Sequence, residues 1–198
     1  MKLTTGSQKR QTLTLFALAT VLLAGAVPQA FAAESKVEQV GSAVVKYKGS
    51  NIQAAVGYRF ADDTLGSKWL FLDFAATGTE GESVAIARTK ISVQTPDGNT
   101  VPLATQKEFL DAYNQLRSEI ARANIAGEPL DYWGGRRPCL LDFFSSGTHV
   151  VQESAFVNVY RVCFGRLYFH VPGGVQPGKY VLVVGLKEGE MRIPFTLQ

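Results

Sequence analysis

The chain has 198 residues and a formal net charge of +3, which comes from 20 Lys and Arg residues against 17 Asp and Glu residues. Three of the basic residues and none of the acidic ones lie within residues 1–32, so the rest of the chain carries 17 basic and 17 acidic side chains. A nucleic-acid or acidic-membrane partner requires a surplus of Lys and Arg on one face of a protein. We therefore expect no nucleic-acid partner, and the length of the chain after residue 32 suits one domain.

The N-terminal segment has the three zones of a secretory signal peptide: a basic start, an apolar run over residues 13–27 and a small-residue exit. The apolar run is 15 residues long, which is shorter than the roughly 20 residues that a membrane-spanning helix needs. Ala30, Phe31 and Ala32 match the A-x-A cleavage pattern and predict cleavage after Ala32; an uncleaved membrane anchor is the alternative. We expect residues 1–32 to be a signal peptide and the protein to be periplasmic or extracellular, with no further membrane span.

Alternating and β-branched residues predict strands in the first half of the remaining chain. The strongest core candidate is the apolar run over residues 69–74, which fits a strand buried on both faces or nearly so. Pro96, Asp97 and Gly98 predict a turn, because proline presets φ and glycine tolerates a positive φ. The predicted strands cover residues 42–48, 52–60, 69–74 and 84–93, and a short strand follows through Val101.

The periodicity then changes to that of a helix. Apolar side chains recur at i, i+4, i+7 and i+11, which predicts one buried face of a helix over about residues 105–124. Thr105 and Glu108 have the spacing of a capping box in front of it. We interpret the apolar face as packing against a sheet and not as a partner groove. The four side chains of this face are Phe109, Tyr113, Leu116 and Ile120.

Strand patterns return in the last third of the chain, separated by turns rich in glycine, proline and serine. Turns at this spacing predict an antiparallel sandwich or barrel. The expected architecture is one mainly β domain over residues 33–198, with a helix-and-loop insertion at residues 104–138. The predicted strands of this part are residues 139–144, 150–163, 166–171, 180–186 and 191–197.

Four segments have the apolar runs and the Pro-Asp-Gly turn of a sandwich domain: residues 69–78, 91–98, 164–172 and 180–184. Together they cover about a third of the chain after the predicted signal peptide, and they resemble the telokin-like, immunoglobulin-type β-sandwich of exported bacterial domains. The resemblance implies an antiparallel immunoglobulin-like β-sandwich, an exported setting and a role in binding or assembly. It implies no catalytic residue. The helix and loop over residues 104–138 depart from that pattern.

Cys139 and Cys163 are the only two cysteines of the chain. An even number of cysteines in an exported protein predicts pairing, because the compartment is oxidising. A disulfide closing a loop of this length contributes about 3 kcal/mol in the chain-entropy account. The alternative is two separately buried thiols.

One cluster has the residue types of nucleophilic catalysis: Asp142, Ser145, Ser146 and His149. It supports an alternative function, a hydrolase acting on envelope or extracellular polymers. No G-x-S-x-G elbow surrounds either serine, and a catalytic triad is recognised by geometry. The simpler interpretation is the end of a strand followed by a turn.

Neither histidine lies in a metal-binding motif. In the predicted strand over residues 166–171, His170 is on the same face as Tyr168, which we interpret as an outward position. No carboxylate or cysteine lies near it at ligand spacing. We therefore expect no metal and no cofactor.

Residues 131–137 combine large aromatic and arginine side chains with two glycines. Tyr, Trp and Arg dominate binding hot spots, and glycines let a loop adapt to a partner. Alternatively, the aromatic side chains cap the core and the arginines pair with Glu128 or Asp131. The hypothesis is an exported, non-enzymatic binding or assembly module that contacts an unknown protein or envelope component through this loop. Its candidate binding residues are Tyr132, Trp133, Arg136 and Arg137.

Overall fold

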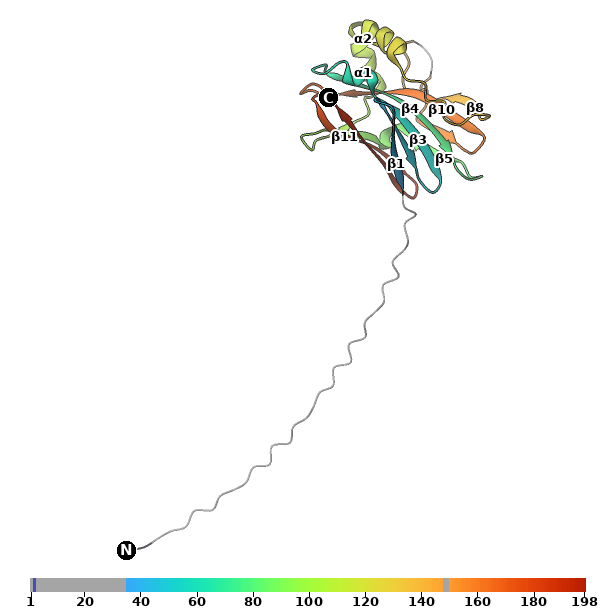
Figure 1. The fold of residues 1–198 in the computed structure, drawn as a ribbon. Coiled ribbons are helices and arrows are strands. Elements are labelled where there is room, and N and C mark those ends of the chain that lie inside the picture. Colours follow the sequence, from blue (N-terminus) through green and yellow to red (C-terminus); the bar gives the residue numbers. More distant parts are fainter. Residues whose placement is uncertain (1, 3–34, 148–149) are drawn as a thin grey trace. The chain divides into compact units, whose positions relative to one another are not determined.

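The computed structural model describes residue 2, residues 35–147 and residues 150–198. Apart from residue 2, the predicted signal peptide with its cleavage site lies outside these residues, and so does His149. No helix in the described residues is long and apolar enough to cross a membrane. The described residues form three sheets and one long helix, which confirms the predicted mainly β class (Figure 1).

The largest sheet has six strands in the order β1-β2-β3-β4-β10-β8. Neighbouring strands in it are antiparallel, except that β8 is parallel to β10. The strands β1 to β4 are sequential in the chain, whereas β10, which pairs with β4, follows the long helix in the sequence. The strands are β1 (Lys36–Val40), β2 (Val44–Lys48), β3 (Ile52–Gly57), β4 (Trp69–Gly78), β10 (Arg161–His170) and β8 (Arg137–Leu140).

A second sheet has four antiparallel strands in the order β12-β11-β6-β7. It shares one hydrophobic core with the first sheet, in which Leu72 and Phe74 of β4 belong to the same buried cluster as Leu182 of β11. A pair of short strands, β5 and β9, also contributes to this core. The strands are β6 (Ile91–Gln94), β7 (Thr100–Pro102), β11 (Gly178–Leu186), β12 (Gly189–Leu197), β5 (Val84–Ala87) and β9 (Ser154–Val157).

The helix α2 (Gln106–Ala126) covers the opposite face of the six-stranded sheet (Figure 1). Alternate residues of β4 point to the two faces: Leu70 and Leu72 lie in the shared core, while Phe71 lies in the cluster under α2. The prediction of a strand buried on both faces at residues 69–74 is therefore confirmed. The strand also continues four residues further, to Gly78.

The predicted helix and its capping box are confirmed. The Thr105 hydroxyl accepts from the Glu108 backbone N–H at 3.1 Å, and the Glu108 carboxylate accepts from the Thr105 backbone N–H at 2.7 Å. Phe109 and Leu116 are buried against the sheet, as the apolar periodicity indicates. The helix packs on the domain itself through this face, so the face is not free for a partner.

Several predicted boundaries differ from the structure. The strand expected at residues 150–163 is two strands, β9 and β10, and β10 also includes the separate strand expected at residues 166–171. The strand expected at residues 52–60 ends at Gly57, and its last residues form the short helix α1 (Arg59–Asp62). The pattern over residues 84–93 is two strands of different sheets, β5 and β6, because the 3₁₀ turn at Arg88–Lys90 redirects the chain between them. The strand predicted at residues 139–144 is β8, which runs only from Arg137 to Leu140.

The outward position expected for His170 and Tyr168 is wrong in one respect. Both residues are on one face of β10, but α2 covers that face, so Tyr168 is buried. His170 is half-buried, and its ring centroid lies 5.2 Å from that of Trp69. A two-residue alternation identifies the face of a strand but not what covers it.

Candidate functional site

Trp133 lies on the α2-covered side of the six-stranded sheet and is only 8% exposed. It packs in a cluster with Ala75 of β4 and Val162 of β10. Its indole Nε1 donates a hydrogen bond to the Gln53 Oε1 at 2.7 Å. This position corresponds to the alternative interpretation of the loop, in which the tryptophan caps the sheet.

The other three candidate binding residues lie nearer the surface. The Arg136 Nη1 donates to the Gly78 carbonyl at 2.9 Å and to the Thr77 hydroxyl, which ties the loop to the end of β4. Arg137 is exposed at the start of β8, and the half-buried Tyr132 has the Lys46 Nζ 5.1 Å from its ring centroid. Among the described residues, neither arginine pairs with an acid.

The residues on both sides of the 131–137 loop line a surface groove, which we call the β8 groove. One wall is formed by Gly127 to Leu130, the segment that follows α2, and the other by Leu140 of β8 and Phe164 of β10. The groove has a volume of about 550 Å³. Leu140 is 65% exposed and presents an apolar side chain at the edge of this groove. An apolar side chain of a partner would find an apolar contact here.

An ion pair between Arg166 and Asp73 lines the β8 groove. The Arg166 Nε lies 2.8 Å from the Asp73 Oδ1, and the two side chains are 14% and 21% exposed. Arg166 also donates from Nη1 to the Asn124 Oδ1 at 2.7 Å and from Nη2 to the Ala123 carbonyl at 3.0 Å. Arg166 therefore neutralises a partly buried acid and also caps the C-terminal carbonyls of α2, where a positive charge is favourable.

Burial raises the pKa of Asp73 above its ordinary value, and this effect exceeds the lowering by the charge and the hydrogen bond of Arg166. The cause is that a half-enclosed carboxylate loses hydration that one arginine only partly replaces. Sequence reasoning did not identify this pair. The signal was an aspartate inside the apolar run 69–74, since a carboxylate on a buried strand needs a partner. Nothing in the sequence identifies Arg166 as that partner.

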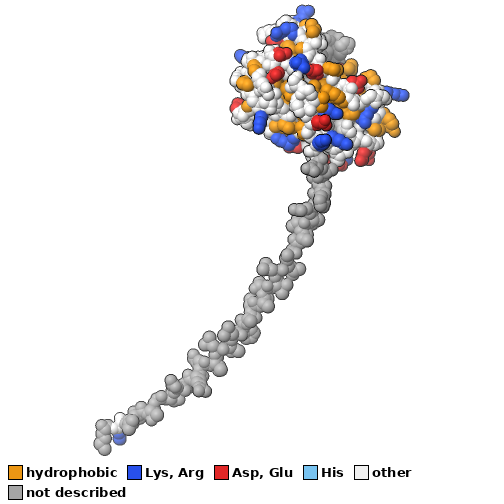
Figure 2. Space-filling model, in the orientation of Figure 1, with side chains coloured by type: hydrophobic (Ala, Val, Ile, Leu, Met, Phe, Trp, Pro, Cys, Tyr) orange, Lys and Arg blue, Asp and Glu red, His pale blue; other side chains and the backbone are white. Residues whose placement is uncertain are grey.

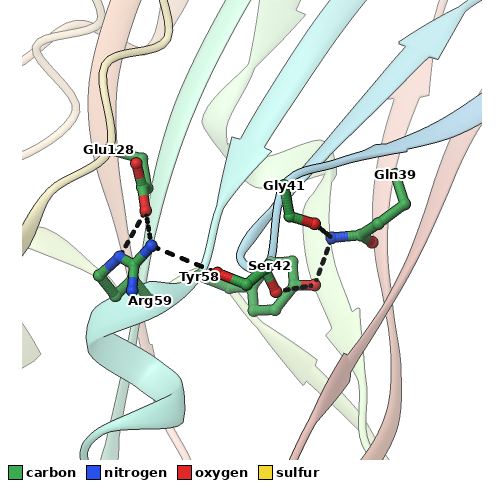
Figure 3. Close-up of polar contacts among 6 residues, drawn as sticks. All are labelled: Gln39, Gly41, Ser42, Tyr58, Arg59 and Glu128. Atoms are coloured by element: carbon green, nitrogen blue, oxygen red, sulfur yellow. Dashed lines mark hydrogen bonds and ion pairs between the residues drawn. The ribbon is translucent and has the colours of Figure 1, made fainter.

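A polar network connects Glu128, which lines the β8 groove, to α1 and to the turn after β1 (Figure 3). Glu128 forms an ion pair with Arg59 of α1. The Arg59 Nη2 also donates to the Ser42 Oγ at 3.3 Å. The Tyr58 hydroxyl donates to the Ser42 carbonyl at 3.2 Å and accepts from the Gln39 Nε2 at 2.9 Å. The segment after α2 is therefore connected through α1 to the far strands of the same sheet.

The predicted disulfide between Cys139 and Cys163 is present. The two residues are direct neighbours in the parallel register of β8 and β10. Gly165 lets the chain after β8 come close, because a Cβ on it would lie 2.6 Å from the Leu141 Cβ. The disulfide thus holds the edge strand that carries Leu140.

The candidate hydrolase residues lie in the irregular segment after β8. Asp142 and Ser146 are exposed, and the Ser145 carbonyl accepts from the Gln106 Nε2 at 2.6 Å. The Ser145 Oγ accepts from the Gly147 backbone N–H at 3.2 Å, as in a serine turn. Because His149 is outside the described residues, the distance from its ring to either serine is not defined, and the hydrolase hypothesis stays a prediction.

Among residues 35–147 and 150–198, no group of three or more His, Cys, Asp or Glu side chains could hold a metal ion. In the same part of the chain, every buried side-chain nitrogen and oxygen has a hydrogen-bond partner. Basic and acidic side chains are interspersed on the face that Figure 2 shows. The β8 groove thus offers apolar contact and satisfied polar groups, an arrangement suited to binding.

Comparison of the chain with protein-family models, with curated proteins and with solved structures gave no match.

Proposed function

We propose that this protein is an exported, non-enzymatic binding or assembly module that contacts a protein or envelope component through the β8 groove and the adjoining loop 131–137. The observation that carries the proposal is Leu140, a 65% exposed leucine on a strand that a disulfide holds in place. A preformed apolar contact binds with little ordering cost, because its position is set before the partner arrives. The charged groups beside it, Glu128 and Asp73, are paired with Arg59 and Arg166.

The fold proposed with this function is an immunoglobulin-like sandwich with α2 inserted on its outer face. Two mainly antiparallel sheets that share one core support this proposal. The parallel pair β8 and β10 departs from a wholly antiparallel sandwich, and it creates the groove. In this proposal, the insertion over residues 104–138 adds a binding site to a sandwich scaffold.

Export is the part of the proposal that is tested most directly. The A-x-A pattern at Ala30 to Ala32 predicts that signal peptidase cleaves before Ala33. The intact mass of the protein recovered after export should correspond to residues 33–198, with two hydrogens fewer for the disulfide. A mass that includes residues 1–32 would identify an anchored protein instead.

Site-specific photocross-linking tests the β8 groove. A photoreactive residue at Leu140 should cross-link to a defined partner in cells, whereas the same residue at Glu188, exposed in the turn between β11 and β12, should not.

Leu140→Asp should weaken this binding by about 2 kcal/mol or more, the scale of a hot spot. Because Leu140 is mostly exposed, the same change should alter stability by only about 0.5 kcal/mol. Identical cross-linking patterns at both positions would remove the groove as the contact surface.

A further inference from the structure

The first strand, β1, is an edge of the six-stranded sheet with little of the domain around it. Among the residues that the structure describes, its only neighbour in that sheet is β2. Lys36, Val37, Glu38 and Gln39 are all exposed, and Val40 is half-buried. An uncovered edge strand presents unpaired backbone N–H and C=O groups, and another strand can pair with them.

The other edge strands of the two larger sheets each contain a proline, and β1 does not. Pro102 lies in β7, Pro138 in β8 and Pro194 in β12, which are the three remaining edge strands. Proline has no N–H to give to a ladder, so an edge strand that contains it resists further pairing. Of these four edges, β1 alone has a full set of backbone donors.

The edge is also preformed. The Gln39 Nε2 donates to the Tyr58 hydroxyl at 2.9 Å and to the Gly41 carbonyl at 3.2 Å (Figure 3). These bonds hold the end of β1 against the core of the domain, and β2 pairs with all five of its residues. A pairing strand therefore meets an ordered template.

When two copies of β1 pair antiparallel, one register places each positive charge opposite a negative charge. In an antiparallel pair, two residues that face each other either both point their backbone N–H and C=O groups toward the partner strand or both point them away, and the two cases alternate along the strand. When two copies of one strand pair symmetrically, the symmetry axis therefore passes through a residue that faces its own copy. A centre at Val37 places Lys36 opposite Glu38 of the second copy twice. A centre at Lys36 or at Glu38 would place like charges opposite each other.

The neighbouring strand strengthens this preference. Across the β1–β2 pair Lys36 faces Lys48 and Glu38 faces Lys46, and like charges directly opposite each other are unfavourable. Among the described residues, neither Lys36 nor Glu38 takes part in an ion pair. In the register centred on Val37, Glu38 of the second copy lies on the free side of Lys36 and offsets the charge of Lys48. The 39% exposed Val37 side chains meet at the symmetry axis.

We propose that β1 pairs antiparallel with β1 of a second copy of this chain, centred on Val37, and joins the two six-stranded sheets into one. The interaction uses a different surface from the β8 groove and does not depend on the function proposed for that groove.

Charge reversal tests the pairing with its own internal control. The protein purified after export should sediment as a dimer, whereas Lys36→Glu and Glu38→Lys should each weaken the dimer about tenfold or more, because two attractive pairs become repulsive. An equimolar mixture of the two variants should form a heterodimer, since both acidic side chains of one chain's β1 then face both basic side chains of the other's. The double variant Lys36→Glu/Glu38→Lys should again dimerise alone.

Lys187→Glu, in the turn between β11 and β12, makes the same charge change away from β1 and should leave the dimer unchanged. Circular dichroism and thermal unfolding check that each variant is folded. Because both side chains are exposed, we expect every variant to fold. Wild-type protein that remains monomeric up to its solubility limit would overturn the proposal. So would a dimer that is insensitive to both single reversals, or a mixture of the two variants that does not associate.

Discussion

Replacing Trp133 with alanine is expected to lower the free energy of unfolding by about 3–5 kcal/mol, the scale for emptying a buried aromatic site. The indole is 8% exposed and fills the space between Ala75 and Val162 on the outer face of the sheet. Its loss also removes the hydrogen bond that the Gln53 Oε1 accepts from the indole N–H. Urea unfolding followed by fluorescence of the remaining Trp69, with circular dichroism as a second probe, measures the change.

The neighbouring Tyr132 provides a matched control. It is half-buried and lies beside Trp133, with ring centroids 6.2 Å apart, so Tyr132→Ala should cost clearly less than Trp133→Ala. Trp133→Phe should recover part of the loss, because it restores volume but not the hydrogen bond. If Trp133→Ala abolished partner cross-linking and left the unfolding midpoint unchanged, the tryptophan would be a binding anchor and not a cap.

Arg166→Met is expected to destabilise the protein by about 2–3 kcal/mol at neutral pH, the scale of hydrogen bonds to a charged group in a partly buried ion pair. The methionine keeps most of the apolar length of the side chain. What is lost is the charge beside Asp73 and the hydrogen bonds to the Ala123 carbonyl and Asn124 at the end of α2. Chemical unfolding at several pH values measures both the size and the pH dependence of the effect.

The pH dependence follows from the Asp73 carboxyl. Its pKa is already raised by burial, and removing Arg166 takes away the two influences that lower it, so the pKa of the folded variant rises further. The folded variant then binds a proton at pH values where the unfolded chain has lost it, and its stability increases as the pH falls toward that raised pKa. The deficit of Arg166→Met relative to wild type should therefore be smaller at acid pH than at neutral pH.

A double variant separates the charge effect from packing. Asp73→Asn/Arg166→Met has no carboxylate to leave unpaired, so it should be more stable than Arg166→Met alone at neutral pH, and the change in deficit with pH should disappear. Equal deficits of the single and double variants at every pH would mean that Arg166 acts only through the end of α2.

Local features of the sequence determined the helix, the strand-rich class and the cysteine pair. Thr105 and Glu108 lie three residues apart, and the apolar face recurs every three or four residues, so neighbours along the chain specify α2 without the rest of the fold. The short apolar run at residues 69–74 specified β4 in the same way. With only Cys139 and Cys163 in the chain, a disulfide had a single possible connectivity.

Tertiary structure alone decided which side chains form the site. Asp73 and Arg166 meet because β4 pairs with β10 in a register where they are direct partners, and they are 93 residues apart in sequence. Trp133 is buried because the loop after α2 folds back over that same sheet face. Loop composition favours burial of a large aromatic side chain but does not say which surface covers it. The physical reason is that side-chain periodicity records which face of an element is apolar, whereas contacts between elements depend on pairing, register and coverage, and these leave no local pattern.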